Sequence, residues 1–152
     1  MTVPFRSAVF VVGVALAALL PGVSAVGVSA DVVAEVNQRR AEAGCGPVRP
    51  LASLTRAAQA HSVDMARHQR LDHTGSDGSR PQDRMRSAGY RPAHFGEAIA
   101  STSADAGTVT KLWMDSPQHR EIILTCRYRD AGVGRADGAG DSWWTLDLAT
   151  RR

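Results

Sequence analysis

The sequence has little lysine, only two cysteines and no apolar run long enough to cross a bilayer. The modest charge and the short apolar run limit the kinds of partner and of membrane attachment to expect. The chain has 152 residues and a formal charge of +3, which falls to +2 without Arg6. This charge is modest, and the chain holds no basic cluster interleaved with aromatic residues, so we expect no nucleic-acid partner. The strongest apolar run, Ala8–Leu20, has about 13 residues, fewer than the ~20 that cross a bilayer.

Residues 1–30 have the layout of a secretory signal peptide. Arg6 is their only charge and precedes the apolar run, and Pro21 ends the run. Small residues then provide two cleavage sites, near residue 25 and near residue 30. An uncleaved membrane anchor is the alternative, but the run is short for one. We therefore expect residues 31–152 to form a single extracellular domain, with no stable membrane insertion after cleavage.

Export gives the two cysteines a role. Cys45 and Cys126 allow only one pairing, and a disulfide is the default state in an oxidising compartment. The bond would close a loop of about 80 residues, and the chain-entropy estimate for such a loop is about 4–5 kcal/mol at most. No unpaired cysteine would then remain to act as a thiol nucleophile.

The spacing of apolar residues predicts helices first and a hairpin last. The expected helices are 31–43, 51–69, 82–87, 104–115 and a short one from Pro117; the expected strands are 131–134 and 142–148, and 95–100 is a strand or an irregular buried segment. In the last strand Trp144, Leu146 and Leu148 share one face, since side chains alternate. This order predicts an α+β fold with helices packed on a small sheet.

Two residues stand out as candidates for chemistry. His73 follows a long predicted helix at the mouth of a glycine-rich loop, where a side chain can be both fixed and open. The simpler interpretation is an exposed loop histidine bonded to Asp72. Glu97 enters an apolar stretch, so it must be paired, either with an arginine or with histidines across a cleft. His61 lies on the apolar stripe of its helix, which favours a packed core histidine.

The stretch from Asp115 to Arg120 joins a serine and a histidine. Ser116 before Pro117 is a helix start, with the Ser116 side chain expected to cap free amides. This occupation argues against a Ser116 nucleophile. His119 then falls in the first turn, where the helix dipole favours the neutral imidazole that ligates metals or accepts protons.

An ordered set of short motifs resembles the bacterial branch of the CAP superfamily, which includes cysteine-rich secretory, antigen 5 and pathogenesis-related proteins and whose domain is also called SCP. The resemblance spans about residues 31–149. The matching residues are His73-Thr74-Gly75, Arg84, Gly89-Tyr90, Gly96-Glu97, Trp113-Met114-Asp115-Ser116-Pro117-Gln118-His119-Arg120, Gly132-Val133-Gly134 and Trp143-Trp144-Thr145.

The resemblance implies an α-β-α sandwich with a small central antiparallel sheet and a groove. His73, Glu97 and His119 match the groove positions, where some members bind a divalent metal such as zinc, and two histidines with one glutamate are a sensible zinc set. The chain has Ser116 where eukaryotic members place a second glutamate, and Gln118 where they have glycine.

Two functions agree with these residues. The first is a non-enzymatic secreted domain that binds a lipid, a cell-wall component or a protein through the groove, and the absence of an evident nucleophile favours it. The alternative is a metal-dependent hydrolase, a protease or an esterase, that uses the same groove. The family likeness alone does not decide between them.

Overall fold

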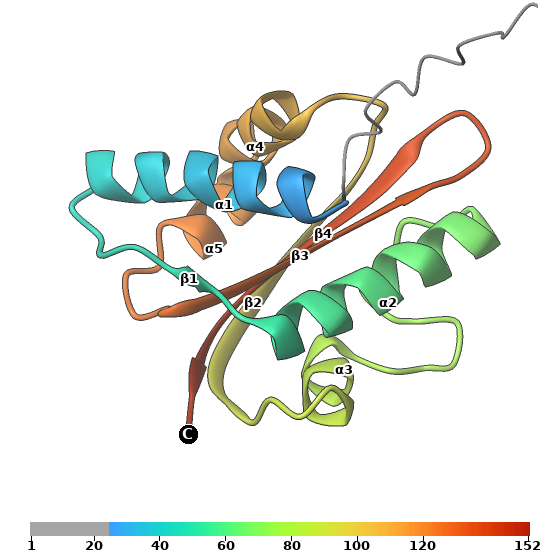
Figure 1. Ribbon diagram of the computed structural model, residues 1–152, viewed down its shortest axis with the longest axis horizontal. Coiled ribbons are helices and arrows are strands. Elements are labelled where there is room, and N and C mark those ends of the chain that lie inside the picture. Colours follow the sequence, from blue (N-terminus) through green and yellow to red (C-terminus); the bar gives the residue numbers. More distant parts are fainter. Residues whose placement is uncertain (1–24) are drawn as a thin grey trace, which may run out of the picture.

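The computed structural model describes residues 25–152, so the first 24 residues of the predicted signal peptide lie outside the described part. The described range contains five helices and four strands (Figure 1). They are α1 (Ala25–Glu42), β1 (Arg49–Pro50), α2 (Ala52–His68), α3 (Pro81–Ser87), β2 (Pro92–Ser101), α4 (Ala106–Asp115), α5 (Pro117–Ile123), β3 (Asp130–Asp137) and β4 (Ser142–Arg151).

The four strands form one sheet in the order β1-β3-β4-β2. β4 pairs antiparallel with both β2 and β3, whereas the two-residue β1 pairs parallel with β3. The segment 95–100, open between two interpretations in the sequence, belongs to the ten-residue strand β2. β1 falls in a segment where no strand was predicted, because two residues show no periodicity.

Helices cover both faces of this sheet, which makes the fold the expected α-β-α sandwich (Figure 1). The predicted face of Trp144, Leu146 and Leu148 packs in one core cluster with residues of α1, α4 and α5. The next residue along β4, Ala149, packs in a second cluster with Leu54 of α2 and Met85 of α3. Neighbouring residues of β4 thus supply the two cores, as side-chain alternation requires.

Two glycines of β3 let α2 lie directly on the sheet. A Cβ at Gly132 would stand 2.1 Å from the main-chain carbon of Leu54, and one at Gly134 would stand 2.4 Å from that of Ala58. Any side chain at these positions would push the helix away. This close contact fixes the first two turns of α2 against β3.

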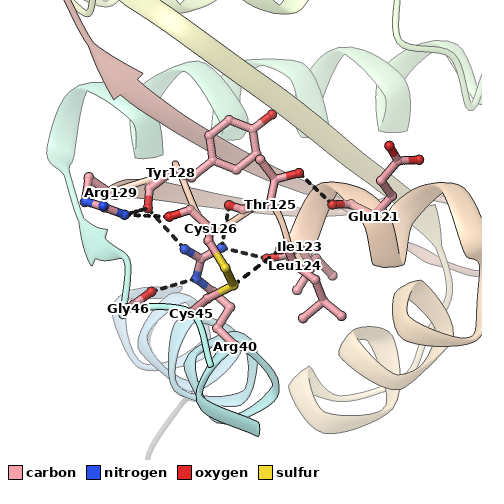
Figure 2. The surroundings of a disulfide bond; sticks show 10 residues. All are labelled: Arg40, Cys45, Gly46, Glu121, Ile123, Leu124, Thr125, Cys126, Tyr128 and Arg129. Carbon is pink, nitrogen blue, oxygen red and sulfur yellow. Dashed lines mark hydrogen bonds between the residues drawn. A yellow bond between two sulfur atoms is a disulfide. The ribbon is translucent and has the colours of Figure 1, made fainter. Parts of the chain in front are cut away.

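The end of α1 and the segment after α5 meet at one corner of the molecule, which contains the disulfide and the buried Arg40 (Figure 2). The predicted disulfide between Cys45 and Cys126 is present, with the two residues 81 positions apart. Beside it, the fully buried Arg40 donates hydrogen bonds to main-chain carbonyl oxygens only. These belong to Gly46 (3.1 Å), Ile123 (2.7 Å), Thr125 (3.1 Å) and Tyr128 (3.1 Å).

The helix predicted over 31–43 begins earlier, at Ala25, and includes residues that the sequence offered as a cleavage site. Val28 packs against the core, and the Ser29 hydroxyl donates to the Val133 carbonyl at 3.2 Å. Across residues 25–152, none of the helices combines the length and apolar character needed to cross a membrane.

Candidate functional site

Glu97 is the centre of a cluster of polar side chains between β2 and the helices α2 and α3. Its side chain is buried, and each carboxylate oxygen has its own donor. His73 Nδ1 donates to Oε1 at 2.8 Å, and Arg84 Nη2 donates to Oε2 at 2.6 Å. The two partners weighed from the sequence, an arginine and a histidine, are therefore both present.

His73 is held by the loop that follows α2. The Thr74 amide donates to the Asp72 carboxylate at 2.7 Å, and Arg84 Nη2 donates to the His73 carbonyl at 3.0 Å. Because a carboxylate only accepts hydrogen bonds, Nδ1 carries the proton in the neutral ring, and Nε2 is left as an acceptor. The side chain is 52% exposed, so the oriented ring faces solvent.

Arg84 comes from α3, and its side chain is only 8% exposed. It also donates to the Ser79 carbonyl at 2.8 Å, which ties the glycine-rich loop to α3. Arg84 belonged to the motif set in the sequence but had no predicted role. The structure makes it the counter-charge of Glu97.

The pKa of Glu97 reflects two opposing effects. Burial raises the pKa of the carboxyl, but the hydrogen bond from His73 and the charge of Arg84 outweigh this and hold the pKa below its ordinary value. Glu97 is therefore ionised at neutral pH.

Asp147 was missed in the sequence. It lies opposite Glu97 in the β2–β4 register, it is 1% exposed, and its oxygens have no donor among residues 25–152. Burial first, and the Glu97 charge next, raise the pKa of Asp147 well above its usual range. A signal was available, because Asp147 falls on the strand face opposite Trp144 and Leu146, and both faces of this strand are buried.

His61 is the packed core histidine that its helical position predicted. Nε2 lies 2.9 Å from the Asp72 carbonyl oxygen and therefore carries the ring proton, while Nδ1 has no partner within the described range. Nε2 is 3.9 Å from Glu97 Oε1, too far for a hydrogen bond. Burial lowers the pKa of His61 despite the nearby Glu97 charge.

His119 lies in the first turn of α5 and is half-buried. Burial, and then the nearby charge of His73, lower the pKa of His119, so the neutral imidazole predicted for this position is favoured. Ser116 occupies the N-cap position, and its carbonyl accepts from the Arg120 amide at 2.8 Å. However, the Ser116 side chain makes no cap hydrogen bond, so the predicted hydroxyl cap is wrong.

The fit of a divalent metal follows from these contacts. Glu97 is neutralised by Arg84 and bonded to His73, which suits a group that orients a histidine better than a direct ligand. Two imidazoles, His73 and His119, then remain as ring-nitrogen ligands. In the part of the chain that the structure describes, no three histidine, cysteine, aspartate or glutamate side chains are grouped to hold a metal ion.

The protein is thus an α-β-α sandwich with a histidine–glutamate pair at the edge strand β2. Comparison with known proteins shows which family has this fold. The model of the cysteine-rich secretory protein family (CAP) matches residues 33–148. This chain therefore belongs to the CAP family. The uncharacterized protein YkwD of Bacillus subtilis (strain 168) is 33% identical over 112 residues, which cover 74% of this chain and 43% of that protein.

Solved structures show the same fold. An extracellular protein containing an SCP domain from Bacillus anthracis matches with a TM-score of 0.77 and 21% identity, over 82% of this chain and 41% of that one. An outer surface protein of Borrelia burgdorferi matches with a TM-score of 0.73 and 17% identity, over 80% of this chain and 90% of that one. The chain thus spans less than half the length of YkwD and of the Bacillus anthracis protein.

Proposed function

We propose that the chain is a secreted binding module that holds its ligand at His73 and His119 and does not cleave it. The observation that carries this proposal is the double engagement of Glu97. One oxygen orients His73 and the other neutralises Arg84. The carboxylate therefore fixes a half-exposed ring whose Nε2 is open to a ligand, and the neutral His119 offers a second ring.

A lipid with a polar head, a cell-wall component and a partner protein can each present a hydroxyl or carboxyl group to these rings. A hydroxyl donates to a neutral imidazole nitrogen, and a carboxylate pairs with the protonated ring. The ligand is therefore a larger molecule that presents a hydroxyl or carboxyl group to the two rings.

The test follows the imidazole signals of 15N-labelled protein by NMR during titration with palmitate and, separately, with peptidoglycan fragments. We expect the His73 and His119 signals to shift with one of these probes. The shift should disappear in His73→Ala and persist in His68→Ala, an exposed histidine at the end of α2 that serves as the matched control. If neither probe moves either ring, or if His73→Ala binds as well as the parent, the proposal fails.

Hydrolysis is the alternative, because a carboxylate that orients an imidazole also suits a general base. Turnover of ester and peptide substrates, measured with and without added zinc, separates the two. Turnover that is lost in His73→Ala and His119→Ala but kept in His68→Ala would replace binding by catalysis as the function.

Secretion is the second part of the proposal. It is supported by the signal-peptide layout and by relatives described as extracellular or outer-surface proteins. Cleavage near residue 25 would keep the contacts of Val28 and Ser29, whereas cleavage near residue 30 would remove them. We therefore expect the exported protein to begin close to residue 26, as checked by mass spectrometry of the culture medium. A chain that stays with the cells at full length would contradict this.

A further inference from the structure

One end of the sheet collects arginines that are scattered in the sequence. The carboxyl end of β4, the beginning of β2, β1 and the segment before β3 meet there (Figure 1). We call this surface the arginine end. Its members are exposed, and they are Arg49, Arg91, Arg127, Arg129, Arg151 and Arg152.

The strand pairing shows that these residues are neighbours. Arg49 pairs with Asp130, and Asp130 in turn pairs with Ala149 near the end of β4. At the other side, Arg151 pairs with Pro92, and the Arg152 amide donates to the Arg91 carbonyl at 3.1 Å. Adjacent strands lie about 4.8 Å apart, so the row across four strands is about 14 Å wide.

Two of these side chains, Arg49 and Arg151, contact a small buried pair, Tyr90 and Asp130. Tyr90 donates to the Asp130 carboxylate at 2.9 Å, the Arg151 guanidinium lies over the Tyr90 ring at 5.1 Å, and Arg49 is 3.7 Å from Asp130. Arg127 contacts His94 at 3.4 Å. The Arg49 side chain nevertheless remains 82% exposed, so its guanidinium is available to a partner.

The net charge of the whole chain does not reveal how positive this surface is. The arginine end has six arginines beside one acidic side chain, the buried Asp130, and a carboxylate at Arg152 would still leave it strongly positive. The other described residues carry 11 basic and 14 acidic side chains. The modest total charge therefore results from one strongly positive end and a mildly negative remainder, and such a field steers anions to one place.

We propose that the arginine end binds a linear phosphate polymer that carries no bases, such as a chain of phosphodiesters outside the cell. Planar guanidinium groups bind phosphate oxygens in pairs, and a row of them fits successive phosphates of an extended chain. Exposed large apolar residues within 25–152 are Val63, Leu71, Phe95 and Leu112, and of these only Phe95 lies beside the row. The surface thus offers little to insert into a membrane or to stack on bases.

The experiment measures binding of linear polyphosphate to the purified chain by calorimetry over a range of salt concentrations. The test variant is Arg49→Gln, Arg91→Gln and Arg127→Gln together, which removes three exposed side chains. We expect its affinity to fall by about tenfold and the slope of log K against log salt to decrease by about 2, since each charge contributes ~0.7 on a flexible chain. The matched control, Arg39→Gln, Arg67→Gln and Arg86→Gln, changes the total charge equally and should bind like the parent.

Other partners are outcomes that overturn the proposal. Equal losses in the two triple variants would show that total charge alone acts. Tighter binding to phosphatidylglycerol vesicles or to duplex DNA than to polyphosphate would assign the surface to a membrane or to nucleic acid. Inorganic phosphate at the same phosphate concentration should compete weakly, and full competition would reduce the row to single-ion sites. If the circular dichroism spectrum of the test variant shows that it is unfolded, the double variant Arg91→Gln and Arg152→Gln replaces it.

Discussion

Arg40 and Arg84 are both buried, but their partners differ in kind. Arg40 binds four main-chain carbonyl oxygens and no carboxylate (Figure 2), whereas Arg84 binds two carbonyl oxygens and the Glu97 carboxylate. Carbonyl oxygens do not titrate, so the Arg40 corner fixes where chain segments meet. Around Arg84 the charge fixes a titratable group, which in turn orients His73 toward solvent. The first arginine maintains shape, and the second maintains the ionisation state of a candidate site.

The largest effect is expected at the corner. Replacing Cys45 and Cys126 together by serine should lower the free energy of unfolding by about 4–5 kcal/mol, because the unfolded chain loses a long covalent loop. Urea denaturation measures this, and the His73 ring signal of the folded variant should not move. A shifted His73 signal would show that the two regions are coupled.

At the cluster, Arg84→Met should lower the free energy of unfolding by about 3–4 kcal/mol, since it leaves the Glu97 charge buried without its counter-ion. Adding Glu97→Gln should restore part of the loss. Denaturation of both variants at neutral pH measures the effect, and a double variant no more stable than Arg84→Met would contradict the pairing.

Arg40→Met should lower the free energy of unfolding by about 2–3 kcal/mol, because the buried carbonyls of Ile123 and Tyr128 lose their donor.

The two arginine variants should also differ in the pH dependence of their stability. The folded-state pKa of Glu97 is depressed, so its stabilisation is present above the unfolded pKa and is lost as pH falls through the folded value. The Arg84→Met loss should therefore shrink in acid while the Arg40→Met loss stays level. Denaturation of both variants across acid and neutral pH compares them, and parallel curves would contradict this.

The smallest expected effect concerns Asp147, the buried carboxyl group beside Glu97. Burial, reinforced by Glu97, raises the folded-state pKa of Asp147, so its contribution is present below the unfolded pKa and declines as pH rises, by about 1.4 kcal/mol per unit. Asp147→Asn removes this slope. The variant should gain stability relative to the parent as pH rises from acid toward neutral. Thermal melts over that range test it, with the exposed Asp141→Asn as the control; an unchanged slope would contradict it.

Periodicity in the sequence predicted most helices and the final hairpin, because each long element repeats its own pattern. It did not predict β1, which is too short to have a period, or the early start of α1, because small apolar residues suit both a helix and a cleavage site. The Cys45–Cys126 bond followed because only one pairing exists.

The candidate site was predicted in part. Position along the chain singled out His73 and Glu97, and the structure joins them directly. Asp147 was missed because its meeting with Glu97 depends on the register between two strands far apart in sequence. The arginine end was missed for the same reason, since its members come from four separate segments.

The disulfide has a consequence for survival outside a cell. His73, Arg84, Glu97 and His119 all lie between Cys45 and Cys126, so the bond closes them within one covalent ring. A protease that cuts once in an exposed loop of this ring opens it but releases no fragment. The two halves stay attached and can remain folded together, and a second cut is needed before any part of the site is shed.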